Sequence, residues 1–403
     1  MNSELKQTPP YDHEQDATSS STTNPGKIVA ADSLQAEDVP TVPIDSLELV
    51  ASLQPAISVH SVDMTPFPNL PAPLVGQSSE QERSLSEWLQ IWWDGIRPNY
   101  LSLSLLPILL GTTLAWADTV HPQTPLGRLD LNRLVGCVVL VMLIQIGGHL
   151  TNDYYDYVHG VDTGNLFGPG GLIQQRYVKP TLVLMIGLIL LGMGTTLGLV
   201  FSIGRGSLVY LLGLLAVLGA YFFSATPRPL SSMALGEITG FILFGPLLTL
   251  GACMAQTGGS FTGSAFIYSL PLGFLAMAVI HTNNIRDRET DASAQKLTLV
   301  HLIGLKVSRF IYILLICIAY GIIGILGIVH RGPHLILITF WTLPLLVVAI
   351  SGIIRTKASA SFHTVMRETL QIEIYFVLLL VLGLILTALI PVLSHVPAHL
   401  LPF

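Results

Sequence analysis

Two short segments of this 403-residue chain combine aspartate with asparagine directly after long apolar runs. The first, NDYYDYVHGVD, covers residues 152–162 and follows the uncharged run 134–148; the second, HTNNIRDRETD, covers 281–291. Carboxylates packed this closely repel one another and are costly to desolvate, so near a bilayer they need cations. Aspartate and amide oxygens without thiolates or paired histidines favour a hard ion. Mg²⁺ in particular takes a few carboxylates and fills its remaining positions with water or phosphate oxygens.

The spacing of the first segment predicts one helical face. If the helix continues past Gly148, the residues that recur at i, i+4 and i+7 are His149, Asp153 and Asp156, with Asn152 beside them. Gly160 then permits a turn that brings Asp162 back toward this face. In the second segment the same argument applies at i, i+3 and i+7 to Asn284, Asp287 and Asp291. We expect the two acidic faces to meet over one cavity.

Basic residues are interleaved with these acidic segments. They are Arg176 and Lys179 after the first segment, Arg286, Arg288 and Lys296 within and after the second, and Arg228 in TPRPL. Acid, metal and base together favour a clamp for diphosphate. Acidic residues after a membrane helix are often solvated loop residues, but two Asn-Asp segments on the same predicted side favour a site.

The composition indicates which elements position these segments. The chain is 51% hydrophobic and 11% charged, with a mean hydropathy of +0.64, whereas a soluble domain has roughly 25% charged residues. We therefore predict an all-α, polytopic membrane protein. Nine stretches are apolar enough to span a bilayer, which takes about 20 residues each. They lie near 99–117, 132–150, 181–203, 207–225, 234–255, 265–283, 307–329, 335–353 and 372–393.

The N-terminal part differs from the rest. Residues 1–87 hold 13 of the 25 acidic residues and 3 of the 19 basic ones, and they are rich in Pro, Ser and Thr. Such a segment cannot bury enough apolar surface to offset its ordering entropy. We predict a disordered acidic tail over 1–83 and a transmembrane domain over 84–403. The domain begins with a possible capping box, Ser84 to Glu87, and a tryptophan-rich interfacial helix.

Positive charge predicts the orientation. With nine spans, 13 Lys and Arg residues fall on the side of the two acidic segments and 4 on the other. This bias places the N-terminus and the acidic segments in the cytoplasm.

At the acidic segments the sequence resembles the UbiA superfamily of intramembrane aromatic prenyltransferases, from about Trp92 to the C-terminus. The match rests on Asn152-Asp153-Tyr154-Tyr155-Asp156 with Gly160-Val161-Asp162, and on Asn283-Asn284-Ile285-Arg286-Asp287 with Asp291. The 1,4-dihydroxy-2-naphthoate polyprenyltransferases are similar in further details. These are Arg97-Pro98, the GVDT ending of the first motif and LGEITGFILFGPLLTLGA over 235–252. His149 stands where relatives often carry asparagine, and ASAQKLTL over 292–299 departs from the family's pattern.

The resemblance implies transfer of a polyprenyl group from polyprenyl diphosphate to 1,4-dihydroxy-2-naphthoate. CO₂ and diphosphate would leave and a demethylmenaquinone would form, in a bacterial plasma membrane. The implied Mg²⁺ ligands are Asp153, Asp156, Asp287 and Asp291. Binding of substrate would fall to Asn152, Asn284, Asp162, Arg97, Arg228 and Lys296. We expect membrane lipid as the surroundings and no nucleic-acid partner.

Three further side chains have open roles. Tyr154 and Tyr155 would either line the pocket and stabilise an allylic cation, or anchor the helix at the membrane interface. Glu237, the acidic residue inside the fifth span, would contact the substrate or pair with Arg228.

Two alternative functions remain open at this stage. One is another aromatic acceptor, such as 4-hydroxybenzoate, homogentisate, a chlorophyllide or haem. The other is an ion-coupled transporter, although transporters tend to place their coupling residues at mid-membrane on broken helices, and these segments lie at span ends.

Overall fold

The computed structural model describes residues 83–121, 124, 127–160, 171–224, 226, 229–328, 333–356 and 359–393. Apart from Arg83, the predicted tail lies outside these residues, so its disorder and its boundary stay predictions. The described residues form helices and no β-strand, which confirms the all-α class. The helices are α1 (Leu85–Ile96), α2 (Ser102–Ala117), α3 (Leu131–His159), α4 (Pro180–Ser202), α5 (Ser207–Ser224), α6 (Gly236–Ile242), α7 (Leu248–Thr257), α8 (Gly263–Arg286), α9 (Arg288–Ser293), α10 (Leu299–Ile328), α11 (Leu343–Arg355) and α12 (Ser359–Leu393).

Every one of the nine predicted spans falls on helical residues, but the count of nine is slightly too high. The span 234–255 consists of α6, the π-helical segment Leu243–Leu247 and α7, and 335–353 consists of the 3₁₀ segment His334–Thr342 followed by α11. By length and composition, seven described stretches can cross a membrane, and the bent pair of α1 and α2 would be an eighth. The remaining predicted span, 207–225, falls on α5, whose apolar stretch is the shorter segment Ser207–Phe223. At 1.5 Å per residue that stretch reaches about 26 Å, short of the roughly 30 Å hydrocarbon core.

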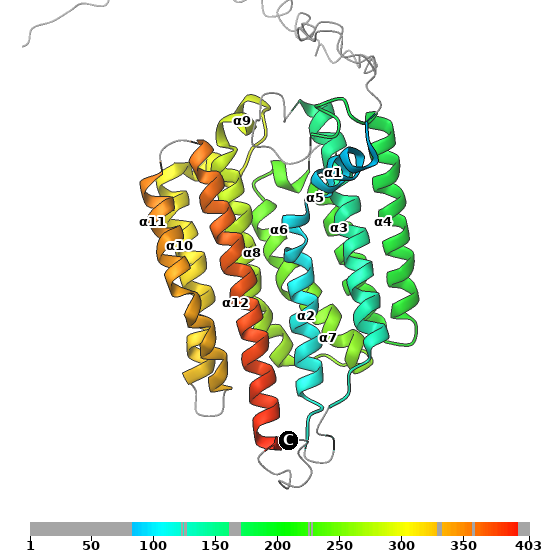
Figure 1. Cartoon of the computed structure of the whole chain (residues 1–403), viewed down its shortest axis with the longest axis vertical. Coiled ribbons are helices and arrows are strands. Elements are labelled where there is room, and N and C mark those ends of the chain that lie inside the picture. Colours follow the sequence, from blue (N-terminus) through cyan, green and yellow to red (C-terminus); the bar gives the residue numbers. More distant parts are fainter. Residues whose placement is uncertain are drawn as a thin grey trace, which may run out of the picture. The chain divides into compact units, whose positions relative to one another are not determined.

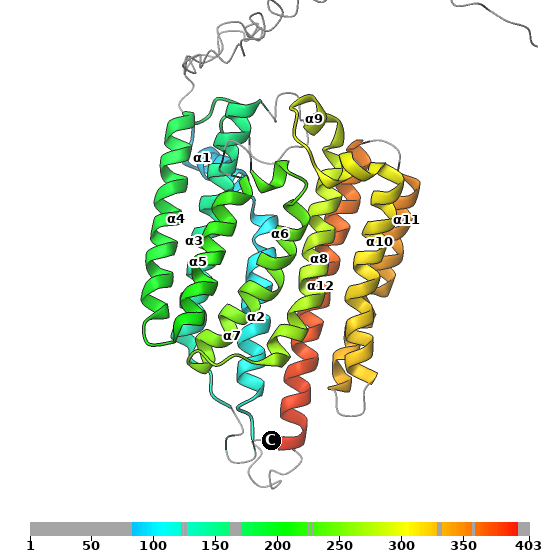
Figure 2. The same cartoon turned by 180° about the vertical axis from the view of Figure 1, so that it is seen from behind.

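The long helices run side by side in one bundle (Figures 1 and 2). In both views α3, α4 and α5 lie on one side, α8, α10, α11 and α12 on the other, and α2 and α6 between them. Glycines allow α3 and α4 to pack closely, since a Cβ on Gly147 would lie 2.8 Å from the carbonyl oxygen of Gly187. This close approach, typical of membrane helices, fixes the helix that holds the first acidic segment.

The two acidic segments lie at the same end of the bundle. Helix α3 continues past Gly148 to His159, and Gly160 ends it in the left-handed conformation at φ 69°, as the sequence predicts. Asp287 lies between α8 and α9, so the second segment bends where a continuous helix was expected. Helix α9 and the upper end of α3 both lie at the top of Figure 1.

Helix α1 lies across this end and brings in a basic residue. The predicted capping box is present, because Ser84 accepts from the Glu87 N–H and Glu87 accepts from the Ser84 N–H. The chain then bends by 51° into α2. Arg97, at the end of α1, has a φ of 57°, and the bend aims it at α3.

Candidate active site

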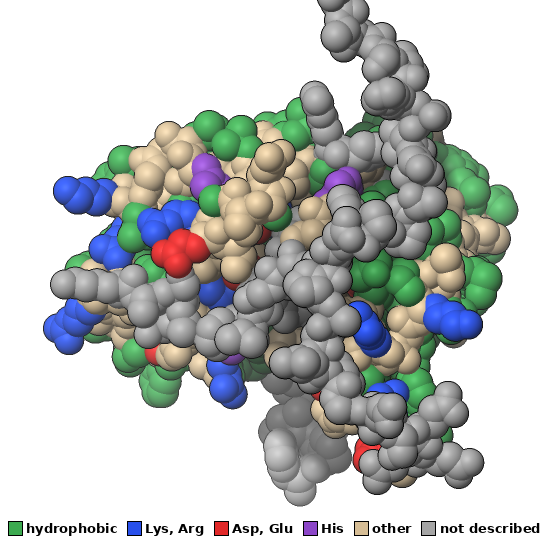
Figure 3. Space-filling model, turned by 90° about the horizontal axis from the view of Figure 1, so that it is seen from above, with side chains coloured by type: hydrophobic (Ala, Val, Ile, Leu, Met, Phe, Trp, Pro, Cys, Tyr) green, Lys and Arg blue, Asp and Glu red, His purple; other side chains and the backbone are tan. Residues whose placement is uncertain are grey.

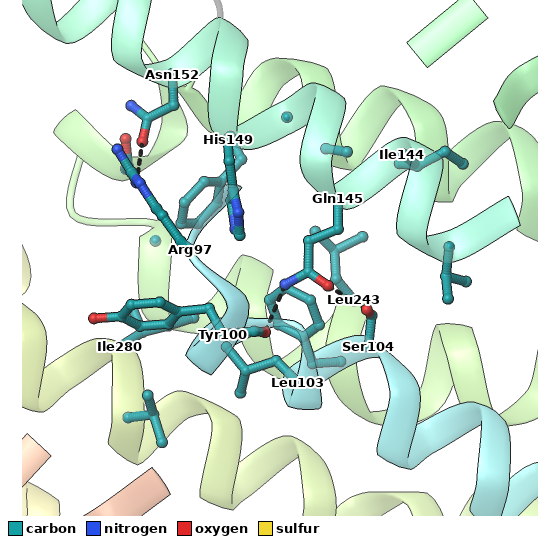
Figure 4. Close-up of a pocket in the computed structure, with 18 of the residues that line it drawn as sticks. Arg97, Tyr100, Leu103, Ser104, Ile144, Gln145, His149, Asn152, Leu243 and Ile280 are labelled. Atoms are coloured by element: carbon teal, nitrogen blue, oxygen red, sulfur yellow. Dashed lines mark hydrogen bonds between the residues drawn. The ribbon is translucent and has the colours of Figure 1, made fainter. Parts of the chain in front are cut away.

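A cavity of about 220 Å³ opens between α2, α3, α5, α6 and α8 below the acidic segments. Much of its wall is apolar, with Leu103, Ile144 and Leu243 among the lining residues (Figure 4). Its polar residues gather toward the end that holds α9. They include Arg97, Tyr100, Gln145, His149, Asn152, Asn284 and Lys296. A cavity with one polar end and apolar walls suits an amphipathic ligand.

The first acidic segment is tied to α1 through Arg97. The Arg97 guanidinium donates to the carboxylate of Asp153, which is fully buried, and to the Asn152 side-chain oxygen at 3.3 Å. The amide nitrogen of Asn152 in turn donates to Asp156 at 2.7 Å. One basic residue therefore compensates a buried carboxylate and orders the asparagine that lines the cavity.

The second segment has its own basic partners. Asp287 pairs with the neighbouring Arg286, and Asp291 pairs with Lys296 at 3.4 Å between Oδ1 and Nζ. Burial raises the pKa of the Asp291 carboxyl to about 6, with Lys296 acting in the opposite direction. These pairs supply the charges that buried carboxylates require.

Lys296 joins the two segments. Burial lowers the pKa of its ammonium group, but attraction from Asp291, Asp156 and Asp287 outweighs burial and holds the pKa above the ordinary value. Asp156 belongs to α3, whereas the other two carboxylates belong to the second segment. Carboxylates of both predicted clusters thus attract one lysine that lines the cavity.

Glu237 lies behind the cavity wall and is almost fully buried. Its Oε1 accepts from Asn284 at 2.9 Å and lies 3.1 Å from Nδ1 of His281. Nε2 of His281 lies 3.1 Å from the carbonyl oxygen of Ser308. Glu237 therefore reaches the cavity through Asn284, and its described partners are these two side chains.

Tyr154 and Tyr155 are not among the residues that line the cavity. Tyr154 packs against the apolar cluster around Leu150 and Leu172, beside the tryptophans of α1, and its ring meets that of Tyr155 edge-on at 5.3 Å. This arrangement favours the anchoring role over the cation-stabilising one. Asp162 and Arg228 lie outside the described residues, so their roles stay predictions.

Within the described ranges, no three carboxylate, histidine or cysteine side chains come close enough to hold a metal ion by themselves. Mg²⁺ is commonly held by one or two carboxylates and by the phosphates of a substrate, without a closed protein cage. Asp291 fits that pattern, because its buried Oδ2 has no hydrogen-bond partner among the described residues, while Oδ1 faces Lys296.

Gln145, which lines the cavity, was missed by the sequence analysis. Gln145 donates to the Tyr100 carbonyl oxygen at 2.7 Å and accepts from Ser104. It lies one turn before His149 on the face that includes Asp153. A polar residue at that spacing inside an apolar run was a signal for this position.

Residues 104–368 match the model of the UbiA prenyltransferase family, which is more than half of the chain. The chain belongs to the UbiA prenyltransferase family. It is therefore an integral-membrane prenyltransferase, and the transporter alternative is set aside.

Several UbiA proteins resemble this chain. The 1,4-dihydroxy-2-naphthoate octaprenyltransferase of Bacillus subtilis is 29% identical over 315 residues, which is 77% of this chain and 96% of the relative. The human UbiA prenyltransferase domain-containing protein 1 is 30% identical over 298 residues, or 72% and 82% of the two chains. A solved UbiA homolog from Archaeoglobus fulgidus has a TM-score of 0.49 at 15% identity, over 72% of this chain and 99% of that one.

Proposed function

We propose that this protein transfers a polyprenyl group from polyprenyl diphosphate to 1,4-dihydroxy-2-naphthoate with loss of CO₂ and diphosphate, giving a demethylmenaquinone. The observation that carries the proposal is Lys296, which lines the polar end of a largely apolar cavity, pairs with Asp291 at 3.4 Å and is attracted by Asp156 and Asp287. A diphosphate at that end would find base and carboxylate together, and its isoprenoid tail would lie against the apolar wall.

The basic residues neutralise the leaving group. Lys296 and Arg97 both line the cavity, and positive charge there stabilises the negative charge that develops as the bond between C1 and the diphosphate oxygen breaks. The apolar wall keeps water away from the resulting allylic cation until the aromatic ring reacts. Arg228 and Asp162 would complete the head-group contacts.

The residues proposed to hold Mg²⁺ are Asp153, Asp156, Asp287 and Asp291, with Asn152 and Asn284 beside them. When bound, Mg²⁺ would supply a Lewis acid to the diphosphate oxygens. Arg97 and Lys296, which pair with two of these aspartates, would shift toward the phosphates as substrate binds.

The naphthoate acceptor is supported by the name and high coverage of the Bacillus relative and by the GVDT and LGEITG sequences. Another aromatic acceptor is the second candidate, because the human relative has a similar identity, 30% against 29%, under a name that states no acceptor.

We further propose that the protein lies in a bacterial plasma membrane with this end in the cytoplasm. Lys and Arg side chains lie around the rim of the end that carries α9 (Figure 3). Together with the 13-to-4 distribution of Lys and Arg along the sequence, these side chains support the orientation, because basic residues are typical of the cytoplasmic side.

The test uses the full-length protein purified in detergent, with Mg²⁺, a polyprenyl diphosphate and a panel of acceptors. Release of pyrophosphate and CO₂ with the naphthoate supports the proposal. Prenylation of 4-hydroxybenzoate without CO₂ release would show that the naphthoate is not the acceptor. No pyrophosphate release with any acceptor would refute the proposed reaction.

A further inference from the structure

His149 has a fixed tautomer. It lies on α3, lines the cavity, and places Nδ1 2.9 Å from the carbonyl oxygen of Ile96, the last residue of α1. A carbonyl oxygen only accepts hydrogen bonds, so Nδ1 must carry a proton. The neighbouring guanidinium of Arg97 lines the same wall and disfavours a second positive charge on the ring. The ring is therefore neutral, and Nε2 keeps its lone pair.

Nε2 of His149 is available to a ligand. Among the described residues, His149 makes no hydrogen bond except the one to Ile96. Its ring meets that of Tyr100 edge-on at 6.4 Å. Figure 4 shows the ring between the side chains of Arg97 and Gln145, within the group of side chains around the cavity.

Neighbouring polar side chains are already engaged with each other. Gln145 uses both ends of its amide on the Tyr100 carbonyl and Ser104. Asn152 accepts from Arg97 and donates to Asp156. A hydroxyl group that entered this part of the cavity would thus find its acceptor at His149.

We propose that Nε2 of His149 accepts a hydrogen bond from a hydroxyl group of the aromatic acceptor and so orients the ring beside the diphosphate end. This inference rests on the proposed function, in which the acceptor is a hydroxyarene. Partial withdrawal of the hydroxyl proton increases the electron density of the ring, which makes its carbon a better nucleophile. His149 thereby selects acceptors that present a free hydroxyl.

The experiment compares 1,4-dihydroxy-2-naphthoate with its two monomethyl ethers, in the full-length protein and in the His149→Ala and His149→Gln variants. A methyl ether cannot donate to Nε2. We expect the wild type to lose about 10-fold or more in kcat/KM with one of the ethers, since one buried hydrogen bond contributes about 1.5 kcal/mol. His149→Ala should use the naphthoate and that ether equally well. His149→Gln should recover part of the preference, because its amide can both donate to Ile96 and accept from the substrate.

His334→Ala is the matched control. His334 also places Nδ1 against a backbone carbonyl, that of Gly327, at 2.6 Å, but it does not line the cavity. This variant should keep the wild-type preference. The KM for polyprenyl diphosphate should stay within about 2-fold in every variant, since only the acceptor contact is changed.

Binding of the same three naphthoates is also measured by titration calorimetry with a non-hydrolysable prenyl thiodiphosphate bound. Turnover by the wild type tests the proposed function. The ratio of kcat/KM, or of affinity, between the naphthoate and the ether tests the role of His149. Unchanged discrimination by His149→Ala in both assays overturns the inference, as does a wild type that binds the naphthoate and both ethers equally well.

Discussion

Glu237 and His281 face each other across 3.1 Å in the interior of the bundle, with both side chains almost fully buried. Nε2 of His281 must donate to the Ser308 carbonyl, so a single further proton lies between Nδ1 and Glu237. The same carboxylate accepts from Asn284. The pair therefore fixes the orientation of an asparagine that lines the cavity, and it connects α6, α8 and α10 in doing so.

Replacing Glu237 by alanine removes the acceptor of two buried donors. Each donor left without a partner costs about 1–3 kcal/mol, so we expect Glu237→Ala to lower the unfolding temperature in detergent and to reduce turnover. Glu237→Gln keeps an acceptor oxygen for Asn284 and should be milder in both respects. Thermal unfolding followed by fluorescence checks the expected order of unfolding temperatures, with the wild type highest and Glu237→Ala lowest. An alanine variant as stable as the wild type would contradict this prediction.

Asp156 is the most direct test of the diphosphate site. It is partly exposed and bonded to Asn152, so Asp156→Ala should leave membrane expression nearly intact and lower kcat by about 100-fold or more. Asp287→Ala should also abolish turnover, although it leaves the buried Arg286 without its partner and some loss of stability is expected. Glu289→Gln, on the exposed face of α9, is the control. Full activity in Asp156→Ala would exclude the clamp.

Lys296 lies between the two acidic segments, so its removal should weaken binding of the diphosphate. We expect Lys296→Met to raise the KM for polyprenyl diphosphate by about 10-fold, since a hydrogen bond to a charged group contributes about 1.5–3 kcal/mol. The KM for the acceptor should change little. Lys306→Met, at an exposed position on α10, serves as the control in the same steady-state assay. If Lys296→Met left the KM for polyprenyl diphosphate unchanged, the diphosphate would not bind at Lys296.

Removal of divalent metal should stop the reaction reversibly. Because the described carboxylates do not form a closed cage, the metal should bind weakly without substrate and tightly with polyprenyl diphosphate. We expect EDTA to abolish pyrophosphate release and added Mg²⁺ to restore it fully. Calorimetry of Mg²⁺ binding with and without the thiodiphosphate analogue tests the second part. Turnover that persists in EDTA would refute the requirement.

The sequence was most informative where spacing alone determines geometry. The run from His149 to Asp156 has helical spacing, and Gly160 can adopt positive φ, so both the face and its end were predictable. The partner of Glu237 was not, because the pairing with His281 depends on how α6 packs against α8, which local pattern does not encode. The split of the second segment at Asp287 was missed for a similar reason. Its spacing fits a continuous helix equally well, and only tertiary contacts decide between the two.

Deleting residues 1–80 tests whether the acidic tail has a part in catalysis. Ser84 and Glu87 cap α1 from within the remaining chain, and Arg97 donates to Asp153 and Asn152 on α3. We therefore expect the truncated protein to keep kcat and both KM values within about 2-fold, since surface changes away from such contacts usually alter stability little. A second truncation that also removes Ser84 should destabilise α1 by about 1 kcal/mol and lower the unfolding temperature. Loss of activity in the shorter deletion, at unchanged protein yield, would show that the tail acts on the catalytic domain.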